Sequence, residues 1–185
     1  MTQWFESAGD HTEEALEAVA ERVRRGGIRH VVVATTSGAT GVRFAEAFRD
    51  AEVDVVCVTH HVGFKGGDDD QLDPAHADAI RAAGGAVLTT SHAFSGVARS
   101  VSKGFGGTSA VEMIAHTLRL FGQGMKVCVE IAVMAADAGL IPTDRDAICV
   151  GGTGRSADTA VVLKPAHSNA FFETRIREAV CRPIG

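Results

Sequence analysis

Two kinds of apolar pattern alternate along the chain. Short, largely apolar runs are typical of strands buried on both faces, and they occur at 31–34, 53–59, 86–89, 147–150 and 159–163. Apolar residues three and four positions apart are typical of amphipathic helices, and they occur at 12–25, 42–48, 74–83, 109–121 and 125–140. This alternation predicts an α/β fold with a mostly parallel sheet.

Some segments depart from this alternation. Only eight residues separate the last two predicted strands, too few for a helical crossover, so we expect these strands to pair antiparallel. Residues 91–108 show no clear period, and the tail at 173–181 fits a strand or a short helix equally well. Thr12 is the expected N-cap of the first helix, with Glu13 and Glu14 in its first turn.

Composition limits the class of protein. The 185 residues suit one domain spanning the whole chain, and a net charge of −5 gives little support to nucleic-acid binding. The four cysteines show no zinc spacing, so we interpret them as reduced core residues of a cytoplasmic protein. The longest apolar run, 127–140, is short and contains two carboxylates, so no membrane contact is expected.

The segment at 35–41, TTSGATG, joins a predicted buried strand to a predicted helix. At the start of a helix the free amides and the helix dipole favour an anion. Gly38 would let the main chain approach a ligand, and Ser37 and Thr40 would add hydroxyl donors. Phosphate is the ligand that fits best. The alternative is that Ser37 or Thr40 only caps the helix.

Three loops leave predicted strands at the same edge of the sheet, where α/β proteins bind ligands. They are 35–41, 60–67 and 90–96, and they contain His60, His61 and His92. Adjacent side chains leaving a strand point in opposite directions, so the pair 60–61 does not suit one metal ion. We therefore expect no metal site and interpret the histidines as hydrogen-bonding groups for a polar ligand.

Other candidate groups remain open. The glycine-rich segment 151–154 is either a second anion-binding nest or a flexible hairpin loop. Glu130 and Asp137 lie in a helix that is apolar nearly all round, so each needs a partner, for which a backbone amide or an arginine is the leading expectation. No nucleophile with its base stands out, because Ser95 lacks a GxSxG context and Cys57 lies within a strand.

Longer segments resemble a known family. They are WFESAGDHT at 4–12, VVATTSGAT at 32–40, VTHHVGF at 58–64, SHAFSGVARSVSKGFGG at 91–107, GMKVCVEIAVMAADAGLIP at 124–142 and GGTGRSADTAVVLKPAH at 151–167. Together they are similar to the stand-alone, mostly archaeal proteins of the pyruvate kinase carboxy-terminal-domain superfamily. This resemblance implies a three-layer α/β/α fold with a mostly parallel sheet and an antiparallel strand near the C-terminus.

The resemblance also implies a cofactor, flavin mononucleotide (FMN), with Ser37, Gly38 and Thr40 holding its phosphate. Strand-end geometry extends this set to the neighbouring loops. The residues predicted to bind the cofactor are Thr36, Ser37, Gly38, Thr40, Gly41, Thr59, His60, His61, Gly63, Ser91, His92, Gly151, Gly152 and Thr153. Phe64, Phe94 and Phe105 are the aromatic residues left to flank a flavin ring.

Two functional hypotheses follow. The first is a binding protein for a phosphorylated small molecule, FMN in particular, with flavin-dependent redox chemistry as an open extension. The second is a regulatory module that senses a phosphometabolite without catalysis. Kinase activity is not expected, because the barrel domain in which pyruvate kinase transfers phosphate is missing from this sequence. A homo-oligomer is expected from the family and from the frequency of such assemblies.

Overall fold

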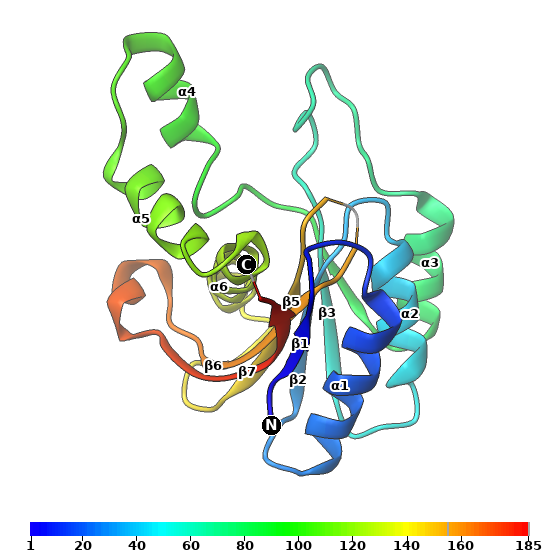
Figure 1. Ribbon diagram of the computed structural model, residues 1–185. Coiled ribbons are helices and arrows are strands. Elements are labelled where there is room, and N and C mark those ends of the chain that lie inside the picture. Colours follow the sequence, from blue (N-terminus) through cyan, green and yellow to red (C-terminus); the bar gives the residue numbers. More distant parts are fainter. Residues whose placement is uncertain (155, 185) are drawn as a thin grey trace.

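A computed structural model describes residues 1–154 and 156–184 and shows a layered α/β protein (Figure 1). Its seven-stranded sheet has the order β1-β7-β6-β5-β2-β3-β4. The strands are β1 Gln3–Phe5, β2 His30–Ala34, β3 Asp54–Val58, β4 Ala86–Leu88, β5 Ala147–Gly151, β6 Thr159–Lys164 and β7 Arg175–Pro183. The helices are α1 Thr12–Arg24, α2 Ala39–Ala47, α3 Pro74–Ala82, α4 Val97–Phe105, α5 Ala110–Arg119, α6 Gln123–Asp137 and the 3-10 helix η1 Ser168–Glu173.

The strand directions confirm the predicted sheet. β2 pairs in parallel with β3 and with β5, β3 pairs in parallel with β4, and β1 pairs in parallel with β7. β6 runs antiparallel to both of its neighbours, β5 and β7. The predicted antiparallel pair near the C-terminus is therefore correct, and the tail, for which two structures were open, forms the strand β7.

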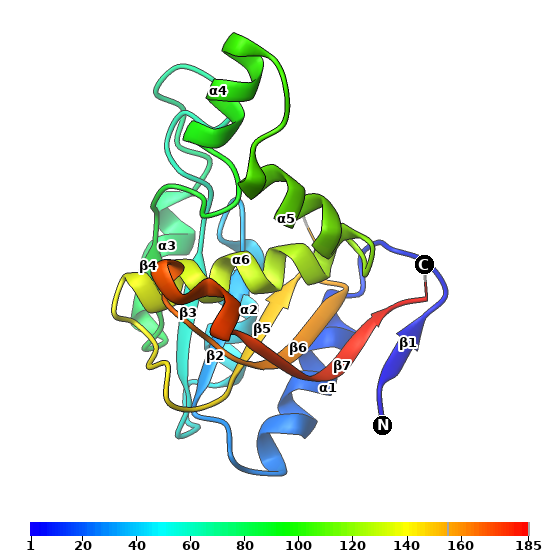
Figure 2. The same ribbon diagram turned by 90° about the vertical axis from the view of Figure 1, so that its left-hand side faces the viewer.

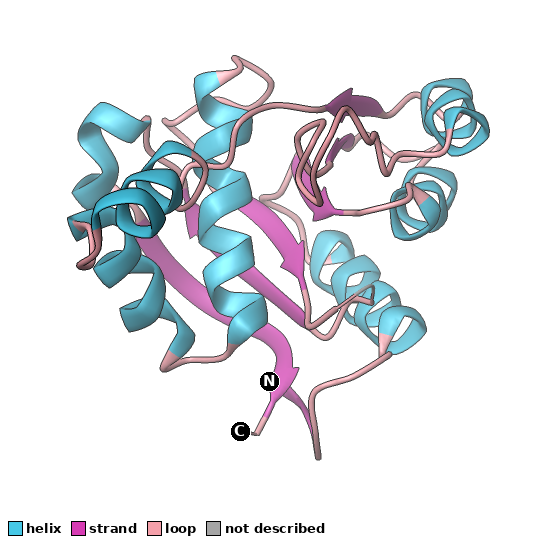
Figure 3. Ribbon diagram, turned by 90° about the horizontal axis from the view of Figure 1, so that it is seen from above, coloured by secondary structure: helices cyan, strands magenta, loops and turns pink. Residues whose placement is uncertain are grey.

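Helices cover both faces of the sheet, as predicted (Figure 1, Figure 3). One core lies between the sheet and α1, α2 and α3, and contains Val19, Phe44 and Ile80. The other lies between the sheet and α5 and α6. Helix α6 crosses this second face and is buried along most of its length, as its apolar sequence predicts.

One local prediction needs correction, and two elements were not predicted. The N-cap of α1 is His11, and the Thr12 hydroxyl instead donates to Asp10 Oδ1 at 2.8 Å and accepts from the amide of Ala157 at 3.1 Å. The segment without a clear period, 91–108, contains the helix α4. The N-terminal strand β1 was not expected, since three residues are too few to show a period.

Helix α4 projects away from the sheet beside α5 (Figure 2). None of its residues is buried, and Val97, Val101 and Phe105 are exposed. It is flanked by Gly96 and Gly106, both with positive φ, which let the chain turn sharply at each end. The helix therefore belongs to the molecule's periphery and not to either core.

All four cysteines are buried and unpaired, in agreement with the prediction of reduced core residues. Burial raises the pKa of Cys57 and of Cys181 to about 12, so these thiols stay protonated and unreactive near neutral pH. Within the described residues, no helix combines the length and the apolar character that crossing a membrane requires.

Candidate functional site

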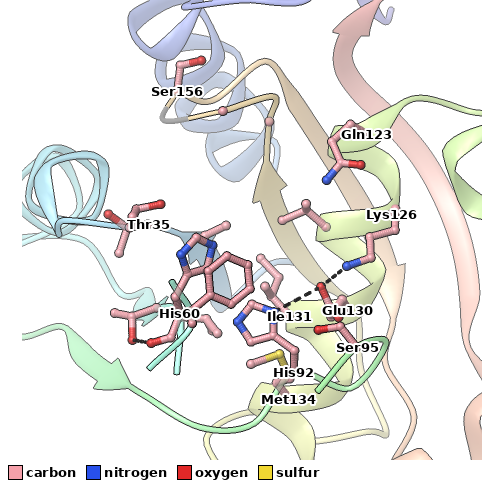
Figure 4. A pocket seen from close by; sticks show the side chains of 18 of the residues that line it. Thr35, His60, His92, Ser95, Gln123, Lys126, Glu130, Ile131, Met134 and Ser156 are labelled. Atoms are coloured by element: carbon pink, nitrogen blue, oxygen red, sulfur yellow. Dashed lines mark hydrogen bonds and ion pairs between the residues drawn. The ribbon is translucent and has the colours of Figure 1, made fainter. Parts of the chain in front are cut away.

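A cavity of about 160 Å³ opens at the carboxyl ends of β2, β3 and β5 (Figure 4). On the sheet side it is lined by residues at the ends of these strands, including Thr35, Thr36 and Thr59. On the opposite side it is lined by α6. Parallel strands bring their carboxyl ends to one edge, so three loops far apart in sequence meet at this cavity, as predicted.

The first turn of α2 lies beside this edge. Gly38, with φ of 96°, is the N-cap, and no side chain caps the helix, so neither Ser37 nor Thr40 plays that alternative role. The buried Thr35 hydroxyl instead accepts from the amide of Gly41 at 3.3 Å. Among the hydrogen bonds of the described residues, none uses the amides of Ala39 and Thr40, which remain available as donors.

The glycine at position 38 serves packing against α3. A Cβ built there would lie 2.5 Å from His76 Cβ and 3.1 Å from Leu72 Cδ1. The ring Nδ1 of His76 also lies 2.8 Å from the carbonyl oxygen of Ser37, within hydrogen-bond distance. This half of the turn is thus covered by α3, and the turn meets the cavity through Thr35 and Thr36.

A buried ion pair on α6 forms part of the cavity wall. Lys126 and Glu130 are one helical turn apart, are 5% and 3% exposed, and their side chains are hydrogen-bonded. The other oxygen of Glu130, Oε1, accepts from the amide of Phe94 at 2.8 Å. The prediction that Glu130 needs structural partners is confirmed: one is a backbone amide, and the other is a lysine in place of the expected arginine.

Burial shifts the pKa values of this group. Burial is the largest effect on Lys126 and lowers its pKa below the usual value, while the Glu130 carboxylate opposes the shift. His92 lies with Nδ1 4.0 Å from Glu130 Oε2, and burial lowers its pKa to about 4, again against the attraction of Glu130. His92 is therefore neutral at pH 7, and its buried Nε2 has no hydrogen-bond partner among the described residues.

Positive charge dominates the cavity. Arg99 from α4, Arg119 from α5 and Lys126 line it, and Glu130 is the one carboxylate among its described lining residues. Three cations and one carboxylate leave a surplus of two positive charges, without counting the histidines. The Arg119 guanidinium is oriented by a 2.8 Å hydrogen bond from its Nε to Gln123 Oε1 in the first turn of α6. A dianion is the complementary ligand.

Flat rings form another part of the wall. His60 and Phe64 stack with centroids 3.9 Å apart, and His92 lies 5.2 Å from Phe64. The ring Nδ1 of His60 is 2.8 Å from Gln71 Oε1, which fixes the plane of this imidazole. The guanidinium of Arg99 lies 6.0 Å from the Phe64 centroid. Such a stack suits a planar, partly polar ring in a ligand.

The glycine-rich segment after β5 is held by an internal carboxylate. Asp158 is fully buried, and its Oδ2 accepts from the amide of Thr153 at 3.2 Å, while its Oδ1 accepts from the Thr159 hydroxyl at 2.7 Å. Asp158 therefore already occupies one amide of this segment with a negative charge, which disfavours a second anion there. Gly152 itself lines the cavity.

The structure brings together part of the predicted set. Thr36, Thr59, His60, His92 and Gly152 line the cavity. The other predicted residues lie outside its lining: Ser37, Gly38, Thr40, Gly41, His61, Gly63, Ser91, Gly151 and Thr153.

Several lining residues were not predicted, chiefly the charged and polar ones on α4, α5 and α6. These are Arg99, Arg119, Gln123, Lys126 and Glu130, and Ser95 joins them from the loop before α4. A usable signal was present, because Lys126 precedes Glu130 by four residues in an otherwise apolar helix, the spacing of a helical ion pair. The spacing of Arg119 and Gln123 gives no such signal, because a helix break lies between them.

The fold and the cavity define an α/β protein with a cationic site at the carboxyl edge of its sheet. The sequence model described as pyruvate kinase, alpha/beta domain matches residues 13–163. The chain therefore belongs to the pyruvate kinase alpha/beta domain family, which confirms the resemblance.

A solved structure, that of an O-ureido-L-serine synthase, is similar over 61% of this chain, with 20% identity and a TM-score of 0.32. The matched part spans 30% of the length of that synthase. At this TM-score the likeness says nothing about how the present chain works.

Proposed function

We propose that this protein binds a phosphorylated small molecule, FMN in the first place, in the cavity beside α6. The observation that carries this proposal is the net charge of the cavity lining. Arg99, Arg119 and Lys126 exceed the single carboxylate, Glu130, by two positive charges. A phosphate monoester near neutral pH carries close to two negative charges, so it would neutralise this surplus. Thr35 and Thr36 at the end of β2 also line the cavity and offer hydroxyl groups at the same edge.

The residues present fit a flavin in part. The stacked rings of His60 and Phe64 offer a flat, partly apolar wall for the ring system, and the arginines offer a partner for the phosphate. The cavity of about 160 Å³ is smaller than the range of about 300–1,000 Å³ typical of ligand sites, so one end of the mononucleotide would lie at its open side. When bound, the flavin would supply redox chemistry.

The purified protein tests this proposal directly. A yellow preparation whose chromophore is released on denaturation and has the mass of FMN supports it. Protein freed of ligand is then titrated with FMN and with riboflavin, which carries the same ring without phosphate. We expect FMN to bind at least about 10-fold more tightly, since one charge-assisted hydrogen bond contributes roughly 1.5–3 kcal/mol. Equal affinity for the two flavins would contradict the phosphate assignment.

A second function is favoured by the small cavity, which matches a compact phosphometabolite better than a whole mononucleotide. In this case the protein is a sensor, and the ligand changes its assembly or its contact with a partner. A colourless preparation that phosphometabolites stabilise against heat, and that free FMN does not, would select this function.

A further inference from the structure

The amine of Lys126 lies in an unusual place for a lysine. It lines the cavity and is almost completely buried, whereas Lys65 and Lys103 are exposed. Figure 4 shows its Nζ pointing into the cavity toward Glu130, with His92 on the other side of that carboxylate. Burial of an amine favours its neutral form, which is the nucleophilic one.

We propose that Lys126 forms a protonated imine with a phosphorylated aldehyde or ketone bound in this cavity. The inference rests on the phosphate-binding half of the proposed function and does not depend on flavin. Arg99 and Arg119 would bind the phosphate of such a ligand, which leaves its carbonyl carbon for Lys126.

Glu130 supplies the proton transfers that this reaction needs. The Lys126 ammonium first gives a proton to Glu130, and the neutral amine attacks the carbonyl carbon. A proton then moves from the nitrogen to the former carbonyl oxygen, which gives a neutral carbinolamine. The Glu130 carboxylic acid protonates the hydroxyl, the C–O bond breaks, and water leaves. The net change is ammonium plus carbonyl to iminium plus water, with Glu130 again a carboxylate facing a positive charge.

The surroundings of Lys126 favour this chemistry. The charged and titratable groups around it are Glu130 on its own helix, Arg119 on α5, Arg99 on α4, and His92 and His60 on the loops after β4 and β3. The two arginines disfavour the ammonium form, and His92 is neutral at pH 7 and adds no charge. Glu130 is the one carboxylate among the described lining residues, so no other one in the lining competes for the amine.

Reductive trapping tests the inference with few competing sites, because the chain has four lysines, at 65, 103, 126 and 164. The full chain is incubated with glycolaldehyde phosphate and cyanoborohydride, and the modified peptide is identified by mass spectrometry. We expect modification of Lys126 at least about 10-fold faster than of the other lysines, extending to lower pH than theirs. Inorganic phosphate should protect Lys126.

Three variants accompany the trapping. Lys126→Arg keeps the positive charge beside Glu130 and should lose the adduct, while Lys103→Arg, on the exposed helix α4, should keep it. Glu130→Gln removes the group that transfers the protons, so trapping of Lys126 should become slower. It also removes the carboxylate that raises the pKa of Lys126, so the remaining trapping should extend to lower pH. Circular dichroism of each variant verifies that it folds. Modification of Lys65 or Lys103 as fast as of Lys126 would overturn the inference.

Unphosphorylated glycolaldehyde separates this inference from the proposed function. Thermal stabilisation by phosphates without an adduct at Lys126 would overturn the imine and leave phosphate binding intact. An adduct at Lys126 formed equally fast with both aldehydes and unprotected by phosphate would overturn phosphate recognition and retain the reactive amine.

Discussion

Gly124, in the first turn of α6, lies directly against Thr159 of β6. A Cβ at position 124 would be 2.1 Å from Thr159 Oγ1 and 2.4 Å from Thr159 Cβ, both far inside van der Waals contact. The absence of a side chain therefore sets how closely α6 approaches the sheet. Since Gln123 and Lys126 flank this position, the same contact sets where they stand in the cavity wall.

Gly124→Ala should consequently destabilise the protein by about 1–3 kcal/mol, the usual cost of overpacking. The free energy of unfolding from urea titration measures this change. Gly104→Ala is the matched control, since Gly104 is helical and a Cβ there meets nothing within 4 Å. That variant should be neutral or gain up to about 1 kcal/mol from helix propensity. A Gly124→Ala protein as stable as the native chain would refute the contact.

The Lys126–Glu130 pair should show strong coupling. Lys126→Met leaves a buried carboxylate with the Phe94 amide as its remaining described hydrogen-bond partner, and should cost about 3–5 kcal/mol of stability. Combining it with Glu130→Gln removes both charges while the Gln oxygen still accepts from Phe94, so much of the loss should be recovered. A double-mutant cycle from urea unfolding measures the coupling energy. Additive single effects would show that the two side chains act independently.

His92 should make stability depend on pH. Burial lowers its pKa to about 4 in the folded protein, whereas a histidine in the unfolded chain titrates near its ordinary value of 6.5. Between these values the unfolded chain binds more protons, so the contribution of His92 is fully present above pH 6.5 and is lost as the pH falls toward 4. Unfolding free energies at pH 7.5 and pH 5.0 should differ less in His92→Gln than in the native chain. His116→Gln, at an exposed position on α5, should leave the difference unchanged.

Arg119 should contribute to anion affinity. Arg119→Ala removes one of three cations at the cavity and should weaken phosphate or FMN binding by about 10-fold, equivalent to about 1.4 kcal/mol, at moderate ionic strength. Calorimetric titration measures the affinity. Arg145→Ala, an exposed arginine paired with Asp144 away from the cavity, should bind like the native chain. If both variants bound alike, Arg119 would not be a ligand contact.

The sequence predicted the elements that bury a full face. β2, β3, α6 and the antiparallel partner β6 carry continuous or periodic apolar patterns, because both faces or one long stripe are covered. β1 was not predicted because it has three residues and lies at the edge of the sheet. α4 was not predicted because it buries no continuous apolar face. Its apolar residues Val97, Val101 and Phe105 are exposed and too few to establish a helical period.

The site was predictable only along the strands. The strand ends predicted Thr36, Thr59, His60 and His92 as lining residues, because topology alone places them at one edge. The cations come from α4, α5 and α6, and their convergence depends on how those helices pack over the sheet, which local spacing does not encode. The four-residue spacing of Lys126 and Glu130 was enough to predict an ion pair on one helix. It did not indicate that this pair faces a cavity.

Helix α4 has one more consequence. A helix of nine residues is too short to persist in water by itself, and this one gains little from the body of the protein. Arg99 is therefore held at the mouth of the cavity only as firmly as α4 stays wound. An anion that binds Arg99 would favour the helical form of this segment. Slower amide hydrogen exchange between Gly96 and Gly106 would therefore report ligand binding without any chromophore.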